Sequence, residues 1–254
     1  DVERSRGLGD VYKRQTILRN CAKEPEVLEL ANYLNNCGAK ISGAGQSKII
    51  VQGVKKLEAG RWNVLFDRIE AGTYLVAGAI TNGHVKVNKI DPQTISIVSE
   101  KLRDMGVKVN IGSDFVEVDA TSSDLKAQHI FTEPFPGFPT DMQAQFMTLN
   151  AIASGECIIE ETVFENRFQH VTQLRKMGAG ITLNKNRASV SGVSNLVGAN
   201  VSASDLRASA SLVLAGLVGR NKTEINDIYH IDRGYECIEE KLNKLGAEII
   251  REPV

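Results

Sequence analysis

Four copies of one short pattern recur along this chain, and the recurrence constrains the fold more than any other feature. In each copy an amphipathic run ends in an apolar residue or cysteine, followed by glycine, a small residue, a polar or small residue, and Ile or Val. The glycines are Gly38, Gly106, Gly178 and Gly246, spaced 68, 72 and 68 residues apart. A repeat of this length indicates one supersecondary unit per copy, so we expect a fold built from similar units.

The run before each glycine has helical spacing, and the residues after it alternate as in a strand. In the first copy the apolar positions are Val27, Leu28, Leu30, Ala31 and Leu34. Helices commonly end at a glycine in the left-handed conformation just past the last turn. After Gly106, residues 108–111 alternate, residues 112–114 give a turn signal, and residues 115–118 alternate again. Each copy therefore predicts a helix, a strand, a turn and a second strand.

A second repeat interleaves with the first. Three segments begin at Asp67, Asp141 and Asp205, continue as an apolar run rich in small residues, break at glycine and end in a strand pattern. Aspartate directly before such a run is an N-cap signal. Because the runs are apolar on most faces, they predict helices that are central and buried.

Together the two patterns define a unit of helix–strand–helix–strand–strand. Nearly complete units occupy roughly residues 67–119, 141–193 and 205–250, and a partial unit occupies 17–54. The expected fold is α/β (α+β), with buried helices inside, sheets outside them and no Rossmann pattern. Since the chain opens in the middle of a unit, we expect a fragment of a longer protein, with residues 1–15 as a foreign or disordered leader.

Composition narrows the classes of function. Thirty basic and 31 acidic residues give a net charge of −1, which disfavours a general nucleic-acid or membrane-surface partner. The four cysteines have no zinc-ligand spacing, and they are typical of reduced thiols in a cytoplasmic protein. The longest nearly apolar stretch, 208–219, is too short to span a bilayer. The sequence therefore favours a cytoplasmic protein without a metal site.

Asp141 has two interpretations. By analogy with Asp67 and Asp205 it is a helix N-cap, and the repeat favours this interpretation. The alternative is a carboxylate exposed at a helix start, placed to take a proton from a substrate hydroxyl. The preceding run EPFPGFPT, residues 133–140, is rich in proline and makes a rigid approach to this position.

Arginines mark the places where the units differ. Arg167 and Arg233 hold equivalent places in the longer loops of the later units, while Arg68 and Arg207 lie at helix starts. Guanidinium groups suit carboxylate and phosphate, and helix N-termini add a favourable dipole, so Arg167, Arg207 and Arg233 could converge on one anion. Separate surface ion pairs explain the same residues equally well.

Four motifs in order carry a family resemblance: FPTDMQAQF (138–146), TVFENRF (162–168), DLRASASLVLAG (205–216) and YHIDRGYE (229–236). From about Thr16 to Val254 the chain resembles the UDP-N-acetylglucosamine 1-carboxyvinyltransferase family of enolpyruvyl transferases. The resemblance implies inside-out α/β barrels in two domains of three units each, with the substrates between them. Residues 16–66 would end the first domain, and residues 67–254 would form the second, with units at about 67–140, 141–204 and 205–254.

The resemblance also implies a reaction. Enolpyruvyl passes from phosphoenolpyruvate to the 3′-hydroxyl of UDP-N-acetylglucosamine by addition and elimination, the first committed step of peptidoglycan synthesis, with no metal or cofactor. The family's catalytic cysteine lies in the half that this chain lacks. No cysteine here receives that role, and we expect the chain alone to be inactive. The alternatives are a non-catalytic repeat module and a related transferase with another acceptor, such as shikimate 3-phosphate.

Residue roles follow from the resemblance one position at a time. Asp141 matches the aspartate that contacts the sugar hydroxyl and accepts its proton. Val163 matches a backbone contact to the nucleotide sugar, and Asp205 matches an aspartate linked to closure. Three arginines match residues of the anionic pocket: Arg233 binds phosphoenolpyruvate and the closing loop, and Arg167 and Arg207 line the same pocket.

Overall fold

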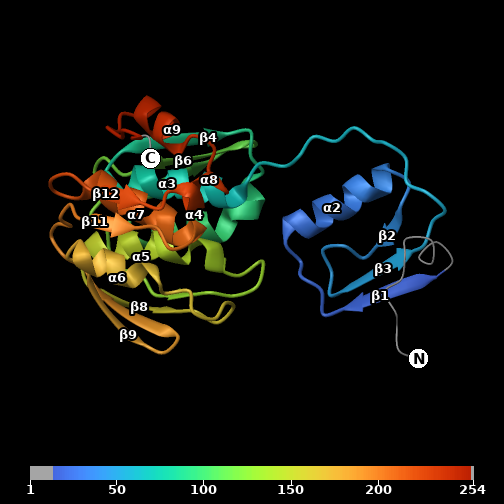
Figure 1. The fold of residues 1–254 in the computed structure, drawn as a ribbon, viewed down its shortest axis with the longest axis horizontal. Helices are drawn as coiled ribbons and strands as arrows, with labels where there is room; N and C mark the ends of the chain where they lie inside the picture. Colours follow the sequence, from blue (N-terminus) through green and yellow to red (C-terminus); the bar gives the residue numbers. More distant parts are fainter. Residues whose placement is uncertain (1–13, 253–254) are drawn as a thin grey trace. The chain divides into compact units, whose positions relative to one another are not determined.

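The computed structural model describes residues 14–252, which fold into two compact units (Figure 1). The N-terminal unit runs up to Phe66 and includes Pro134–Pro136. The C-terminal unit comprises Asp67–Glu133 and the chain from Gly137 onward. Most of the expected leader, residues 1–15, lies outside the described residues.

The N-terminal unit is one helix on a three-stranded antiparallel sheet with the order β1-β3-β2. Its elements are β1 (Gln15–Arg19), α2 (Pro25–Asn36), β2 (Lys40–Ser42) and β3 (Lys48–Gln52). Pro25 opens α2, where its fixed φ suits a first helical position. Gly38 follows the helix with a φ of +94°, a conformation that glycine adopts without strain.

The C-terminal unit contains two full copies of helix–strand–helix–strand–strand. The first copy comprises α3 (Arg68–Ile80), β4 (His84–Asn88), the 3₁₀ turn η1 (Pro92–Ile95), α4 (Ser96–Asp104), β5 (Lys108–Ile111) and β6 (Phe115–Asp119). The second comprises η2 (Thr140–Met142), α5 (Gln143–Ile152), β8 (Glu156–Glu160), α6 (His170–Lys176), β9 (Gly180–Asn184) and β10 (Arg187–Ser191). In both copies the last strand lies between the other two, in the orders β4-β6-β5 and β8-β10-β9.

Two further strands precede the inner helices. β7 (Ile130–Phe131) pairs in parallel with β8 across α5, and β11 (Asn200–Ser202) pairs in parallel with β12 (Glu224–Asn226) across α7 (Leu206–Val218). The sequence pattern left open whether a strand precedes or follows the inner helix. In these two copies the structure has a strand on each side of it.

The third copy is incomplete, which corrects the sequence prediction. After β12 it contains α8 (Tyr229–Asp232) and α9 (Ile238–Lys244), but residues 247–252 form no strand. The Asn243 amide still bonds the backbone N–H and C=O of Ile249 at 2.8 and 2.7 Å, as Asn35 bonds Ile41 at the equivalent position. A strand is defined by its pairing, and residues 247–252 pair with none of the described strands.

Three inner helices form the core of the C-terminal unit. α3, α5 and α7 pack against one another, and nearly all residues of α5 are buried. Small residues allow close packing here, since a Cβ at Gly72 of α3 would meet the side chain of Met142, the last residue of η2, at 3.0 Å. In Figure 1 the β4-β6-β5 sheet lies on one side of these helices and the sheet with β8 and β9 on the opposite side. The prediction of buried inner helices in a mixed helix/strand fold is confirmed, and the described strands form four separate sheets.

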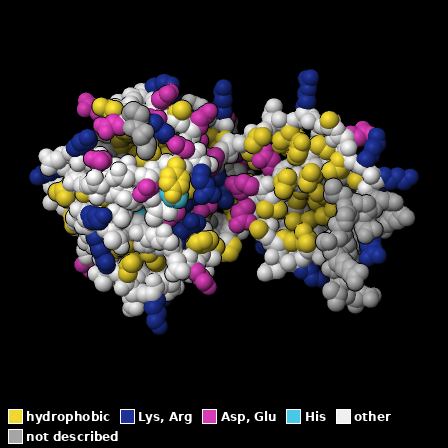
Figure 2. All heavy atoms as spheres, viewed as in Figure 1, with side chains coloured by type: hydrophobic (Ala, Val, Ile, Leu, Met, Phe, Trp, Pro, Cys, Tyr) yellow, Lys and Arg dark blue, Asp and Glu magenta, His cyan; other side chains and the backbone are white. Residues whose placement is uncertain are grey.

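The outer helices differ in what covers their apolar face. Val98 of α4 and Ile238 of α9, each eight residues before its glycine, are 2% and 5% exposed. Leu30 of α2 holds the same position but is 57% exposed. Apolar side chains gather on the N-terminal unit in Figure 2, and Leu28, Trp62 and Val64 are among its exposed large hydrophobic residues. Exposed apolar patches of this kind are typical of binding surfaces.

Candidate active site

Asp141 does not cap its helix, so the N-cap interpretation is wrong for this residue. It lies inside the 3₁₀ turn η2, with no side-chain cap on either η2 or α5. Asp67 and Asp205 do cap α3 and α7, each accepting two backbone N–H groups. Pro139 precedes η2 in an extended conformation, and the resulting 3₁₀ turn leaves the Asp141 carboxylate free for other partners.

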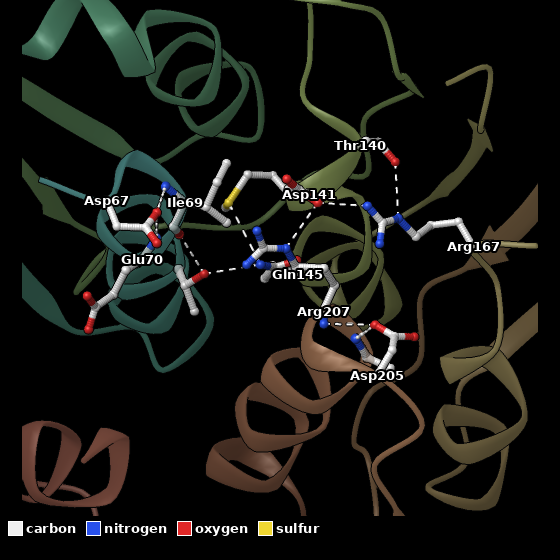
Figure 3. A network of polar contacts seen from close by, with 12 residues as sticks. Asp67, Ile69, Glu70, Thr140, Asp141, Gln145, Arg167, Asp205 and Arg207 are labelled. Atoms are coloured by element: carbon white, nitrogen blue, oxygen red, sulfur yellow. Dashed lines mark hydrogen bonds and ion pairs between the residues drawn. The ribbon is translucent and has the colours of Figure 1, made fainter. Parts of the chain in front are cut away.

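Two arginines bind the Asp141 carboxylate (Figure 3). Arg167 Nη2 lies 2.7 Å and Arg207 Nε 3.0 Å from the same oxygen, Oδ1. The arginine side chains are 14% and 15% exposed, and that of Asp141 is 34% exposed. The two arginines come from the loop before α6 and from the start of α7, so the fold brings together residues that are far apart in the sequence.

The electrostatics of this cluster favour an anion. Burial would raise the pKa of Asp141, but the hydrogen bond and charge of Arg207, with the charges of Arg167 and Arg68, hold that pKa below its usual value. Asp141 is therefore ionised at neutral pH, with the Arg167 and Arg207 guanidinium groups bound to one oxygen of its carboxylate. Arg207 lies in the first turn of α7, where the helix dipole also favours an anion.

Arg167 is held from three directions. Its Nε donates to Thr140 Oγ1 at 3.2 Å, and its Nη2 donates to Asp141. The guanidinium carbon lies 4.5 Å from the centroid of the Phe164 ring, within the range of a cation–π contact. Val163, the neighbour of Phe164, is 45% exposed, and its backbone N–H donates to Glu161 Oε1 at 2.9 Å.

Arg233 does not join the cluster. It follows α8, is exposed, and makes no hydrogen bond or ion pair with Asp141, Arg167 or Arg207 among the described contacts. Of the six residues expected at the site, the structure joins Asp141, Arg167 and Arg207 directly. Asp205 caps the helix that carries Arg207, and Val163 lies in the loop that carries Arg167.

A buried polar layer that the sequence reasoning missed lies within the same unit. The Tyr235 hydroxyl and Thr73 Oγ1 are 2.9 Å apart, and Gln145 Nε2 donates to Thr73 Oγ1 at 3.1 Å. Tyr235 is fully buried, and burial raises the pKa of its phenol. Both Gln145 and Tyr235 lie inside two of the quoted motifs, DMQAQF and DRGYE, but nothing in the sequence pairs them across 90 residues.

Other kinds of site receive no support from the described residues. Within residues 14–252 no three His, Cys, Asp or Glu side chains are placed to hold a metal ion. No helix in the same range is both long and apolar enough to cross a membrane.

Comparison with known proteins identifies the class. The model of the EPSP synthase (3-phosphoshikimate 1-carboxyvinyltransferase) family matches residues 10–242, and the chain therefore belongs to this family. The match confirms the resemblance carried by the four motifs.

Individual relatives are more specific. The chain is 56% identical over 237 residues to UDP-N-acetylglucosamine 1-carboxyvinyltransferases from strains of Coxiella burnetii, including Dugway 5J108-111 and RSA 493 / Nine Mile phase I. The matches cover 93% of this chain and 55% of each relative, so the chain spans about half the length of these curated relatives.

Solved structures share the fold. The enolpyruvyl transferase NikO from Streptomyces tendae is 28% identical, with a TM-score of 0.83 over 94% of this chain and 57% of that one. An EPSP synthase from Acinetobacter baumannii is 20% identical, with a TM-score of 0.64 over 85% of this chain and 53% of that one, which supports the fold alone.

Proposed function

We propose that this protein transfers the enolpyruvyl group of phosphoenolpyruvate to the 3′-hydroxyl of UDP-N-acetylglucosamine, as a cytoplasmic step of peptidoglycan synthesis. The observation that carries the proposal is the Asp141 carboxylate bound by Arg167 and Arg207, in a chain 56% identical to transferases named for that acceptor. The three sheets around the inner helices of the C-terminal unit suit an inside-out barrel. A single carboxylate among guanidinium groups can serve both a hydroxyl and an anion, the two things that this reaction must bind.

The reaction assigns a role to each group. The acceptor hydroxyl oxygen bonds to C2 of phosphoenolpyruvate while its proton passes to Asp141, and C3 takes a proton from water. A C3 proton then returns to water as the C2–C3 double bond re-forms and the C2–O bond to phosphate breaks, which releases inorganic phosphate. Arg167 and Arg207 stabilise the negative charge of the phosphate and carboxylate during both steps. Arg233 contacts phosphoenolpyruvate, Val163 contacts the sugar through its backbone, and Asp205 holds the start of α7.

Asp141 as it stands is a weak base, because the arginines lower its pKa. An anionic substrate competes with Asp141 for the same guanidinium groups. Once the anion engages them, Asp141 loses its counter-charges and gains a negative neighbour, and both changes raise its pKa toward the range of a useful general base. Binding of phosphoenolpyruvate would thus prepare Asp141 to accept the hydroxyl proton.

A chimera tests the proposal. The part of the Coxiella burnetii relative that this chain does not match is joined to the chain, and phosphate release from phosphoenolpyruvate is measured with each candidate acceptor. The proposal predicts turnover that depends on UDP-N-acetylglucosamine. Turnover with shikimate 3-phosphate instead would assign the other acceptor, and a folded chimera that releases no phosphate with either acceptor would refute the proposed reaction.

A further inference from the structure

Glu161 is a buried carboxylate to which the reaction gives no role. It follows β8 directly and is 4% exposed. A buried charge is costly unless hydrogen bonds replace its hydration. Glu161 meets four donors: Thr132 Oγ1, Val163 N and Phe164 N lie 2.8, 2.9 and 3.0 Å from Oε1, and Thr140 Oγ1 lies 2.8 Å from Oε2. All four donors are uncharged, and Glu161 is the acceptor in each of the four bonds.

One of these bonds continues into the active site. The Thr140 hydroxyl donates to Glu161 and accepts from Arg167 Nε. Arg167 in turn donates from Nη2 to Asp141. Since a hydroxyl has one hydrogen, its donation to Glu161 sets which lone pair faces Arg167. The chain of bonds from Glu161 through Thr140 therefore fixes the orientation of the guanidinium group on Asp141.

The other oxygen of Glu161 orders the neighbouring loop. Because the N–H of Val163 is occupied by Glu161, only the carbonyl of Val163 remains to contact a ligand through the backbone. The backbone N–H of Phe164 also donates to Glu161 Oε1. The ring of the same residue lies against the Arg167 guanidinium group. One carboxylate thus braces the Arg167 side chain on two sides.

We propose that Glu161 is a positioning residue that sets Arg167 and the Val163 carbonyl relative to Asp141. This role deepens the proposed function and rests on it for its catalytic meaning, but the geometry it predicts can be measured without turnover. A glutamine at position 161 can face either the three donors at Oε1 or the Thr140 hydroxyl with its amide oxygen, but not both.

The test measures hydrogen exchange of the Arg167 Nε–H group by NMR on this chain, with the resonance assigned from an Arg167→Lys variant. Glu161→Gln is compared with Glu160→Gln, which removes the adjacent carboxylate that pairs with Arg187 at 2.9 Å. We expect Glu161→Gln to speed exchange at least about fivefold, the scale of one net hydrogen bond. Glu160→Gln should leave the rate unchanged.

Thr140→Val provides a second variant that keeps Glu161 and three of its four bonds. It should speed exchange at least as much as Glu161→Gln, and adding Glu161→Gln to it should change little further, since both act through one hydroxyl. In the chimera, Glu161→Gln should lower kcat more than it raises KM. The residues that bind the two substrates are all still present, and only the position of Arg167 relative to Asp141 changes.

The outcomes separate the two proposals. Unchanged Arg167 exchange in folded Glu161→Gln and Thr140→Val proteins overturns the positioning role, as does an equal effect of Glu160→Gln. If Glu161→Gln does not fold, Thr140→Val alone decides between the same two results. An inactive wild-type chimera would overturn the proposed reaction but would leave the exchange result as a decision on Glu161.

Discussion

Replacing Asp141 with asparagine should raise the affinity of this chain for inorganic phosphate. Asp141 Oδ1 occupies donors of Arg167 and Arg207 that an anion would use. Asparagine has nearly the same shape but neither holds the guanidinium groups by charge nor repels an anion. Replacing the proposed general base is thus expected to tighten the binding of phosphate, which is one of the two products.

The magnitude follows from the charge that is removed. Two unit charges about 6 Å apart interact by roughly 3 kcal/mol at an effective dielectric constant of about 20, and by roughly 0.7 kcal/mol in water. The Asp141 side chain is 34% exposed and its partners 14% and 15%, so the effect lies between these limits. About 1–2 kcal/mol corresponds to a dissociation constant roughly 5- to 30-fold lower.

Isothermal titration of the purified chain with phosphate near neutral pH provides the assay. Asp91→Asn is the charge-matched control, because Asp91 caps η1 outside the cluster and asparagine caps equally well. Thermal unfolding of each variant establishes that it is folded. An affinity that stays the same or falls in a folded Asp141→Asn chain, or that rises equally in Asp91→Asn, would refute the competition between Asp141 and the anion.

Three further predictions concern stability and reactivity. The wild type should be more stable than Asp141→Asn above about pH 4, near the unfolded pKa of aspartate. This difference should vanish as pH falls through the lower pKa of Asp141 in the folded chain, and denaturant melts at several pH values would measure it. Gly78→Ala should lower the free energy of unfolding by about 1–3 kcal/mol, because its Cβ would meet two valine side chains at 2.9 Å. Gly216→Ala holds the same repeat position, but its nearest neighbour would lie at 3.5 Å, so in the same melts it should be neutral or slightly stabilising. Burial raises the pKa of Cys157 to about 12, so at pH 8 a thiol reagent should label exposed Cys237 and leave Cys157 unmodified in the folded chain; equal rates would contradict this burial.

Repeat spacing predicted the local elements well, because each depends on residues close in sequence. The four glycines have φ between +88° and +102°, and the strands after Gly106 are β5 and β6. The missing strand of the third copy shows the limit of this reasoning. The segment after Gly246 carries the strand pattern and the Asn243 clamp, but pairing depends on a partner that a local pattern does not contain.

The site was only partly predictable for the same reason. Asp141, Arg167 and Arg207 stand out from the repeat, yet the N-cap signal misled at Asp141, where a 3₁₀ turn replaces the regular helix start. Contacts such as Thr73 with Tyr235, 162 residues apart, depend on how the inner helices pack. Glu161 gave no signal in sequence, because a glutamate directly after a strand is usually solvated.

The central claim is that Asp141 accepts the acceptor's hydroxyl proton among arginines that hold the anion. The most direct measurement is the kcat of the chimera with UDP-N-acetylglucosamine and phosphoenolpyruvate, for Asp141→Asn and the charge-matched Asp91→Asn. Loss of a general base lowers turnover by about 10²–10⁴-fold, so this is the loss expected for Asp141→Asn, with Asp91→Asn near wild type. A folded Asp141→Asn chimera that turns over at the wild-type rate would contradict the account.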